Sequence, residues 1–285
     1  MTTPRMIKTG LASLVTCLSL GATTAKADLI DGIVDIWTVG VSAEFVCSTA
    51  QFSPGTANTA CAPSSMSWGE PALADRSGLS ITNLPPALVT TNGGLQANTA
   101  VTHNNQPVTG NSLDSVTLRS TLTLTPFDPL GGLGLPPASV DFLIDFEETD
   151  NGANPCANGE ANDQGVNING CADIFVLDQT ALNFPFLYDL DGAGGPLEAR
   201  EYFISFFELT NGLNPLAAAA CAAAGATTDP CFGFLTPESQ STTFQFASLI
   251  TTEPVVFETP APASIALFGL ALTALGWSNR RKRKI

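Results

Sequence analysis

Several segments of this chain alternate apolar and polar residues with a period of two, and this pattern constrains the fold more than any other feature. In the segment 115–125, four apolar side chains share one face: Val116, Leu118, Leu122 and Leu124. Threonines and an arginine occupy the other face, as in a half-buried β-strand. Period and composition predict six more strands: 36–46, 87–89, 140–147, 174–177, 202–208 and 244–250.

Turn-forming residues separate these segments, and helix signals are scarce. Runs of Gly, Asn, Asp and Pro occur at 92–94, 129–132 and 191–195. Only 216–224, an alanine-rich run that ends at Gly225, predicts a helix. Many strands joined by short turns predict an all-β fold, an antiparallel β-sandwich or jelly-roll, for a single domain over 28–252.

The spacing of the cysteines adds a second constraint. Cys17 lies in an N-terminal segment with targeting character, and the other six cysteines of the chain form three couples that are close in sequence. An even number of cysteines in an exported chain indicates disulfides. We predict nearest-neighbour pairs, Cys47 with Cys61, Cys156 with Cys171 and Cys221 with Cys231. A zinc site is disfavoured because the chain has no Cys-x-x-Cys and one histidine.

Residues 1–27 have the pattern of a secretory signal peptide. Arg5 and Lys8 precede an apolar stretch over 11–20, and Ala25-Lys26-Ala27 is a small-x-small cleavage site. Signal peptidase is therefore a predicted partner, and the mature chain is expected to begin at Asp28. A retained N-terminal anchor is the alternative, and it is disfavoured because the apolar stretch is too short to cross a bilayer comfortably.

Residues 260–285 form a second targeting segment, joined to the domain by a linker over 253–259. An apolar stretch over about 261–277 has about the minimum length of a transmembrane helix. The basic cluster 280–284 follows it and is expected to stay in the cytoplasm by the positive-inside rule. An ordinary C-terminal anchor is the alternative, and it predicts the same topology.

Between these two ends the chain is acidic and contains no lysine. Three arginines, Arg76, Arg119 and Arg200, stand against all 26 acidic residues, which gives 28–258 a formal charge of −23. Nucleic-acid binding is excluded because a basic surface would be needed to contact phosphate. An acidic body instead leaves carboxylate oxygens available for divalent cations.

The C-terminal segment resembles a PEP-CTERM sorting signal, which an exosortase recognises in Gram-negative bacteria. The matching residues are Pro260, Ala261, Pro262, Ala263 and Ser264, with Arg280, Arg281 and Arg283 in the basic cluster. The sequence departs from the Pro-Glu-Pro pattern of such signals because Ala261 stands where the acid is usual. The resemblance implies an exosortase as partner, a transient anchor in the inner membrane, and release to the cell surface or the extracellular space.

The body of the chain resembles the THxN family of PEP-CTERM proteins. The signature Thr-His-x-Asn is carried by Thr102, His103 and Asn105. Further matching segments are 67–69, 76–79, 146–149, 170–175 and 231–238. The resemblance implies secretion and a β-rich domain, and it implies no particular biochemical activity.

His103 is the only histidine of the chain, and it has two interpretations. In the first, it is a ligand or a proton carrier in a polar turn. In the second, the Thr102 and Asn104 side chains cap the backbone of a turn while His103 forms a hydrogen bond to a neighbouring strand. We favour the second interpretation, because a lone histidine lacks the partners that metal binding or nucleophilic catalysis requires.

Acidic residues offer two kinds of chemistry. A carbohydrate-active enzyme could use a pair drawn from Asp145, Glu147 and Glu148. This prediction is disfavoured because acids are abundant here, and because nucleophile elbows, phosphate loops and His-Glu-x-x-His are absent from the sequence.

Calcium binding is the better use of these acids, although no cofactor is required by the sequence. The segment 147–173 is rich in Asp, Glu and Asn without a basic residue, and a second acidic group follows at 189–191. The candidate ligands are Asp150, Asp163, Asp189 and Asp191. The alternative is a solvated loop held by Cys156 and Cys171, with 191–192 as a hairpin tip.

Together these features predict a non-enzymatic exported protein of the cell surface or the extracellular matrix, associated with exopolysaccharide or biofilm. Two alternatives stay open, a secreted carbohydrate-active enzyme that uses Asp/Glu pairs and a calcium-dependent adhesion module.

Overall fold

The computed structural model describes the body of the chain. The described residues are 32–55, 58–71, 75–130, 132–177, 182–192, 195, 197–210, 214–226 and 231–256. The predicted signal peptide (1–27) and sorting segment (260–285) lie outside these residues. Within the part that the structure describes, no helix is both long and apolar enough to cross a membrane.

The described residues are almost all strand and turn. The strands are β1 (Ile36–Phe52), β2 (Ala60–Ala62), β3 (Ser65–Trp68), β4 (Glu70–Pro71), β5 (Ser77–Asn83), β6 (Ala87–Thr90), β7 (Gln96–Asn105), β8 (Val108–Thr109), β9 (Leu113–Asp128), β10 (Ala138–Glu147), β11 (Asp173–Leu177), β12 (Phe184–Tyr188), β13 (Arg200–Glu208), β14 (Asn214–Pro215), β15 (Phe232–Thr236) and β16 (Gln240–Thr251). A 3₁₀ turn, η1 (Gly165–Asn167), and one short helix, α1 (Ala218–Ala223), complete the elements.

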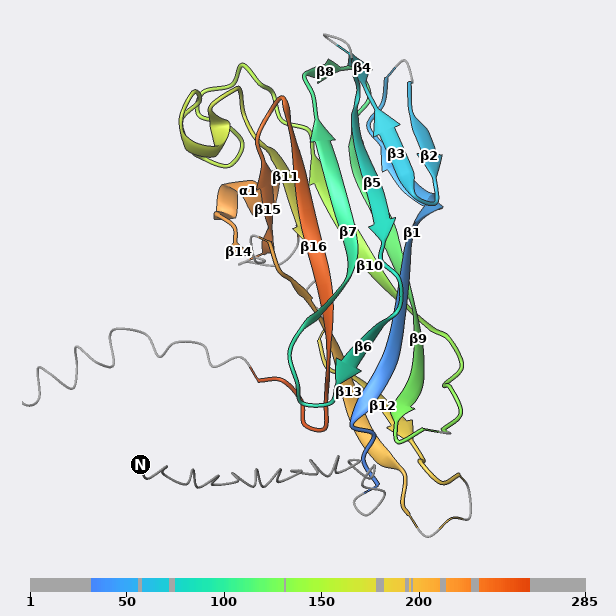
Figure 1. Cartoon of the computed structure of the whole chain (residues 1–285). Helices are drawn as coiled ribbons and strands as arrows, with labels where there is room; N and C mark the ends of the chain where they lie inside the picture. Colours follow the sequence, from blue (N-terminus) through green and yellow to red (C-terminus); the bar gives the residue numbers. More distant parts are fainter. Residues whose placement is uncertain are drawn as a thin grey trace, which may run out of the picture.

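Two antiparallel sheets of seven strands each make up most of the domain, and β4 pairs with β8 in a separate two-stranded sheet (Figure 1). The first sheet has the order β14-β15-β11-β10-β9-β1-β6, and the second has the order β12-β13-β16-β7-β5-β3-β2. One buried cluster contains Phe45, Leu118 and Phe146 from the first sheet and Leu79 and Phe244 from the second. The inner faces of the two sheets therefore share a core, and the predicted all-β, sandwich-like fold is confirmed.

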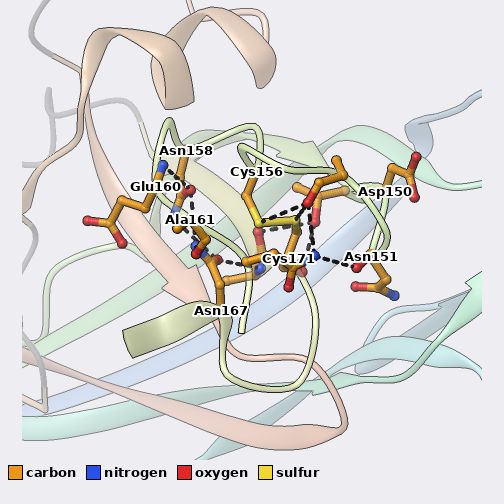
Figure 2. The surroundings of a disulfide bond; sticks show 12 residues. Asp150, Asn151, Cys156, Asn158, Glu160, Ala161, Asn167 and Cys171 are labelled. Carbon is orange, nitrogen blue, oxygen red and sulfur yellow. Dashed lines mark hydrogen bonds between the residues drawn. A yellow bond between two sulfur atoms is a disulfide. The ribbon is translucent and has the colours of Figure 1, made fainter. Parts of the chain in front are cut away.

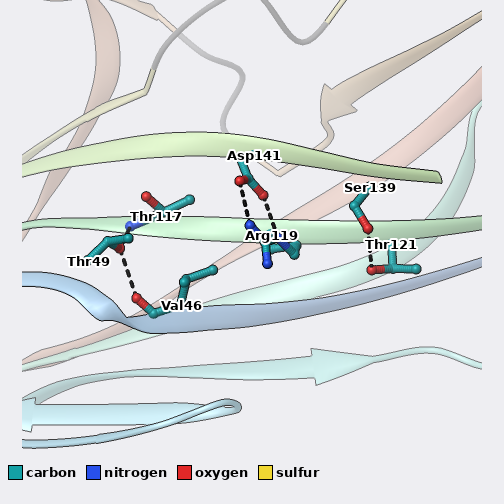
Figure 3. A network of polar contacts seen from close by, with 7 residues as sticks. All are labelled: Val46, Thr49, Thr117, Arg119, Thr121, Ser139 and Asp141. Atoms are coloured by element: carbon teal, nitrogen blue, oxygen red, sulfur yellow. Dashed lines mark hydrogen bonds and ion pairs between the residues drawn. The ribbon is translucent and has the colours of Figure 1, made fainter.

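The strand β9 shows how the alternating pattern produces this architecture. Its inward side chains are at most 6% exposed: Val116, Leu118, Leu122 and Leu124. On the outer face, Arg119 donates two hydrogen bonds to Asp141 of β10, each of 2.7 Å (Figure 3). Burial of one face and solvation of the other explain why the period of two predicted this strand.

A register shift interrupts the pairing of β1 with β9 between Val46 and Gln51. Thr49 compensates for the lost ladder bonds, since its Oγ1 donates to the Val46 carbonyl and accepts from the Thr117 N–H, at 2.8 and 2.9 Å (Figure 3). The side chain thereby satisfies backbone groups that the irregularity would leave unpaired.

All three predicted disulfides are formed: Cys47–Cys61, Cys156–Cys171 and Cys221–Cys231. The first joins β1 to β2 and so links the two sheets. The second closes the loop between β10 and β11, and the third joins α1 to the residue before β15. Three disulfides in one domain are typical of an oxidising, extracellular environment.

Two local predictions need correction. The signature around His103 is the end of the strand β7, between β5 and β16, and the predicted polar turn is wrong. The predicted helix is shorter than 216–224, because α1 covers Ala218–Ala223 and Gly225 leaves it with a positive φ of 74°. Glycine adopts this left-handed conformation without strain, which suits the end of a helix.

Candidate functional site

Segments that are far apart in the sequence meet at one end of the sandwich, the upper end in Figure 1. They are the ends of β3, β7, β10 and β15, the beginning of β11, and the turn between β15 and β16. These are also the segments on which the resemblance to the THxN family was based. We call the residues that meet there the acidic site: Trp68, His103, Asn105, Glu148, Asp173, Thr236 and Glu238.

Three carboxylates form the centre of the acidic site. One oxygen each from Glu148, Asp173 and Glu238 lies within 4.8 Å of the others. Asp173 is fully buried and Glu238 is 1% exposed, while Glu148 is half-buried. Among the residues that the structure describes, this is the one group of three acid, cysteine or histidine side chains with such spacing.

Neighbouring donors hold two of the carboxylates in place. The indole Nε1 of Trp68 donates to Glu148 Oε2 at 2.7 Å, and the backbone N–H of Thr149 donates to Asp173 Oδ1 at 2.9 Å. Each donor occupies one oxygen of its carboxylate. The other oxygen of each carboxylate is left without these donors.

Four carboxylate oxygens remain without a hydrogen bond of good geometry in the described part of the chain: Glu148 Oε1, Asp173 Oδ2, Glu238 Oε1 and Glu238 Oε2. Two buried amide oxygens, Asn105 Oδ1 and Asn151 Oδ1, also lack a hydrogen bond in the described residues. Buried polar atoms almost always have a partner, because an unpaired one loses its hydration without compensation. So many unpaired oxygens in one place indicate a function beyond packing.

Burial dominates the electrostatics of the site. It raises the pKa of Glu148, and it raises that of Asp173 well above the usual range, with repulsion from the neighbouring acids adding to both. Burial also raises the pKa of Glu238, while the Asn151 side chain and the Ser239 N–H act weakly in the opposite direction. No basic side chain is among the causes of these shifts. The site therefore brings three carboxyl groups together without a protein counter-charge.

His103 and Asn105 connect the second sheet to the first beside these acids. His103 Nδ1 lies 3.0 Å from Thr236 Oγ1, and Asn105 Nδ2 donates to the Thr236 carbonyl at 3.0 Å. Thr236 belongs to β15 of the first sheet, and its Oγ1 also donates to the Asp173 carbonyl at 3.4 Å. The hydrogen bond predicted for His103 is therefore present, but its partner lies on the opposite sheet.

The ring of His103 is enclosed by aromatic side chains. It stacks on Trp68 at a centroid distance of 5.8 Å and meets the rings of Phe146 and Phe175 edge-on at 5.6 and 4.8 Å. Burial lowers the pKa of His103 from 6.5 to about 3, so the ring is neutral at physiological pH.

The capping roles predicted for the neighbours of His103 are wrong. Thr102 Oγ1 pairs with Thr243 Oγ1 across the outer face at 2.9 Å, and Asn104 Nδ2 donates to the Arg76 carbonyl at 3.4 Å. Both side chains lie on a strand, so the alternation of β7 directs them away from His103.

The four aspartates predicted as calcium ligands are not brought together. Asp150 and Asp163 are exposed in the loop between β10 and β11, and Figure 2 shows Asp150 near the Cys156–Cys171 disulfide. Asp150 Oδ1 accepts from the Gly152 N–H at 2.9 Å. Asp189 and Asp191 follow β12, at the opposite end of the sandwich (Figure 1). Asp189 Oδ1 and Asp191 Oδ2 accept from the Gly192 and Leu197 N–H groups. These carboxylates stabilise turns.

The acids predicted for a carbohydrate-active enzyme also separate. Asp145 and Glu147 alternate with the inward-facing Ile144 and Phe146 of β10 and so point to the outer face. Glu148 follows the strand and turns inward to the acidic site.

Sequence reasoning identified Glu148 within an acidic run but did not select Asp173 or Glu238 as ligands. The signal that could have found them is the set of family segments, since 146–149, 170–175 and 231–238 each contribute one acid. Comparison with known proteins identifies no family, because no family model and no curated protein matches the chain.

Proposed function

We propose that the protein is an exported, non-enzymatic protein of the cell surface or extracellular matrix, sorted by an exosortase and associated with exopolysaccharide. The observation that carries this proposal is the set of three disulfides in one β-sandwich-like body. Disulfides persist outside the cytoplasm, where signal peptidase and a C-terminal sorting segment would deliver the domain. In this scheme the jelly-roll or sandwich body is the part that is displayed.

The charge of the body supports the same location. The segment 28–258 contains no lysine and carries a formal charge of −23. Strong net charge of one sign keeps a secreted domain soluble and monomeric. It also makes contact with an acidic exopolysaccharide dependent on divalent cations, which bridge carboxylates of both partners.

Burial of the acids favours a non-enzymatic role. Glycoside hydrolysis needs two carboxyl groups that flank the scissile bond of a bound sugar. Asp173 and Glu238 are 0% and 1% exposed, which leaves no room for a sugar between them. The rival proposal, a secreted carbohydrate-active enzyme, would have to use acids of the outer surface.

Localisation tests the sorting part of the proposal. We would express the full chain in two matched Gram-negative hosts, one with and one without an exosortase, and compare protease accessibility on intact cells. The expected result is a shortened, accessible protein only in the exosortase-containing host. Equal localisation in both hosts, or of a chain that lacks 260–285, would overturn it.

A second experiment separates the matrix protein from the enzyme. The purified full chain is incubated with exopolysaccharide of the expressing strain, and both retention on the polymer and release of reducing ends are measured. Retention without release supports the proposal, and release above that of a heat-denatured sample supports the rival.

A further inference from the structure

The acidic site contains an electrostatic conflict that the chain itself does not resolve. One oxygen from each of three carboxylates lies within 4.8 Å of the others, and Asp173 and Glu238 are buried. A buried carboxylate without a counter-charge costs several kcal/mol, and like charges nearby add to that cost. Either bound protons or a bound cation must therefore neutralise the group.

The hydrogen bonds around the group act against neutralisation by protons. Trp68 Nε1 and the Thr149 N–H donate to Glu148 and Asp173, and such donors stabilise the ionised form of a carboxylate. They also orient the free oxygens, as the outer partners of metal ligands do. Four carboxylate oxygens of the group are buried and have no hydrogen bond of good geometry in the described residues.

The chemistry of these oxygens favours calcium, and their spacing is compatible with it. Calcium binds oxygen ligands at about 2.3–2.6 Å, so two oxygens on opposite sides of one ion lie about 4.8 Å apart. The three carboxylates fit within that limit. Magnesium binds at about 2.0–2.1 Å, needs near-ideal octahedral geometry and gives up its water reluctantly, which disfavours it in a buried site. Zinc prefers sulfur and nitrogen ligands, and the group contains neither.

We propose that Glu148, Asp173 and Glu238 bind one Ca²⁺ ion, with the carboxylate of Glu238 available for bidentate coordination. Asn151, whose Oδ1 is buried and unpaired and whose side chain adjoins Glu238, is the next available ligand. The inference does not depend on the proposed sorting or matrix function.

The ion would join three segments at this end of the molecule. Glu148 follows β10, Asp173 begins β11, and Glu238 lies in the turn between β15 and β16. The loop over 150–171 lies between the first two ligands, and its Asn169 Nδ2 donates to the Glu238 carbonyl at 3.2 Å. Ca²⁺ would therefore fix the shape of this loop and turn, which form the upper end of the molecule in Figure 1.

Luminescence of bound Tb³⁺, a substitute for Ca²⁺, tests the proposal directly. Trp68 forms a hydrogen bond to the proposed ligand Glu148 and would transfer excitation energy to an ion in the site. The full chain is freed of metal with EDTA, dialysed and titrated with Tb³⁺ under tryptophan excitation. We expect saturable emission that Ca²⁺ displaces at or below about 1 mM, the range of extracellular calcium modules. Absence of emission, or emission that Ca²⁺ does not displace, would overturn the proposal.

Substitutions of single acidic residues test where the ion binds. Glu238→Gln keeps the shape of the side chain and removes its charge, and we expect at least a tenfold weaker Ca²⁺ affinity. The matched controls Asp150→Asn and Asp189→Asn remove acids that the structure places outside the site, and their affinity should equal that of the wild type. Equal affinity of Glu238→Gln and wild type would refute the site.

A thermal melt of the unsubstituted chain covers the case in which Glu238→Gln fails to fold. Excess Ca²⁺ over EDTA should raise the melting temperature of the wild type, because a ligand that binds only the folded state stabilises it. An unchanged midpoint would refute the proposal, and an equal rise with Mg²⁺ would refute the assignment to calcium.

Discussion

The two ends of the sandwich each contain a buried tryptophan among aromatic rings. The polar atoms near this tryptophan are hydrogen-bonded at one end, whereas several of them are unpaired at the other. At the lower end in Figure 1, Trp37 meets Phe186, Tyr188 and Tyr202 edge-on at centroid distances of 5.1–5.5 Å. The polar atom of each tryptophan and tyrosine ring there forms a hydrogen bond. Trp37 Nε1 donates to Thr91 Oγ1, the Tyr188 hydroxyl donates to the Leu133 carbonyl, and the Tyr202 hydroxyl accepts from the Val34 N–H.

At the upper end, Trp68 stacks on His103 and meets Phe146 edge-on, but its indole N–H donates to Glu148 of the acidic site, where carboxylate oxygens are unpaired. A cluster in which every polar group is satisfied serves stability, whereas unpaired buried charge lowers it. The difference fits a lower end that stabilises the fold, and it supports the proposal that the upper end binds a ligand.

Truncation of the lower tryptophan is the largest expected effect. Trp37→Ala should lower the free energy of unfolding by about 3–5 kcal/mol, the usual cost of emptying a buried aromatic position. Urea unfolding would measure the loss, and Leu187→Ala, at a position that is 63% exposed, is the control. The loss should be the same in EDTA and in excess Ca²⁺. A loss of unfolding free energy that appears only in Ca²⁺ would contradict the separate roles of the two ends.

Two disulfide variants test which loop takes part in calcium binding. Cys156→Ser/Cys171→Ser and Cys221→Ser/Cys231→Ser open loops of 15 and 10 residues. Each should cost about 3 kcal/mol in the chain-entropy model. Only the first pair bounds the loop that contacts Glu238, so only that variant should show a smaller rise in melting temperature on Ca²⁺ addition. Equal calcium responses would show that the loop takes no part in the site.

The sequence predicted most of the first sheet, and physical reasons explain where it did not succeed. In β9 the buried face is apolar and the outer face is polar, so a period of two is visible locally. In β7 the buried positions include Asn98, Thr99, His103 and Asn105. Polar side chains at buried positions hide the period, and Thr-His-Asn-Asn then resembles a turn. Partners elsewhere in the chain determine the strand.

The disulfides could be predicted from the local sequence, whereas the acidic site could not. Each disulfide joins cysteines that are 10–15 residues apart, and short separations favour pairing because closing a short loop costs little entropy. Glu238 meets Glu148 only because β11 pairs with both β10 and β15. His103 likewise reaches Thr236 across 133 residues. Such neighbours follow from sheet order, which no local pattern predicts.

The pH dependence of stability isolates His103 from the acids beside it. Burial holds the pKa of His103 at about 3, so below pH 6.5 the unfolded chain binds a proton that the folded chain excludes. The stabilisation is complete above pH 6.5 and is lost as the pH falls toward 3, by about 1.4 kcal/mol per pH unit. Between pH 6.5 and 5 the wild type should lose about 2 kcal/mol more than His103→Gln, which cannot be protonated there.

Urea unfolding of the two proteins in EDTA at both pH values measures this difference. The comparison removes the contribution of the three carboxylates, since both proteins contain them. The rings of Trp68, Phe146 and Phe175 and the hydroxyl of Thr236 surround the histidine, and none of them titrates in this range. Parallel losses in the two proteins would show that His103 is protonated in the folded state.

The smallest effect is expected on the outer face, where an acid already has its counter-charge. Arg119 holds the pKa of Asp141 below its usual range through a hydrogen bond and charge attraction, in contrast to the raised pKa values of the acidic site. Arg119→Gln should leave the unfolding midpoint nearly unchanged, because both side chains are about half exposed and water screens the pair. Calcium affinity should also be that of the wild type. A higher affinity in this variant, whose body carries one more net negative charge, would mean that the charge of the whole body, and not the buried acidic site alone, governs cation binding.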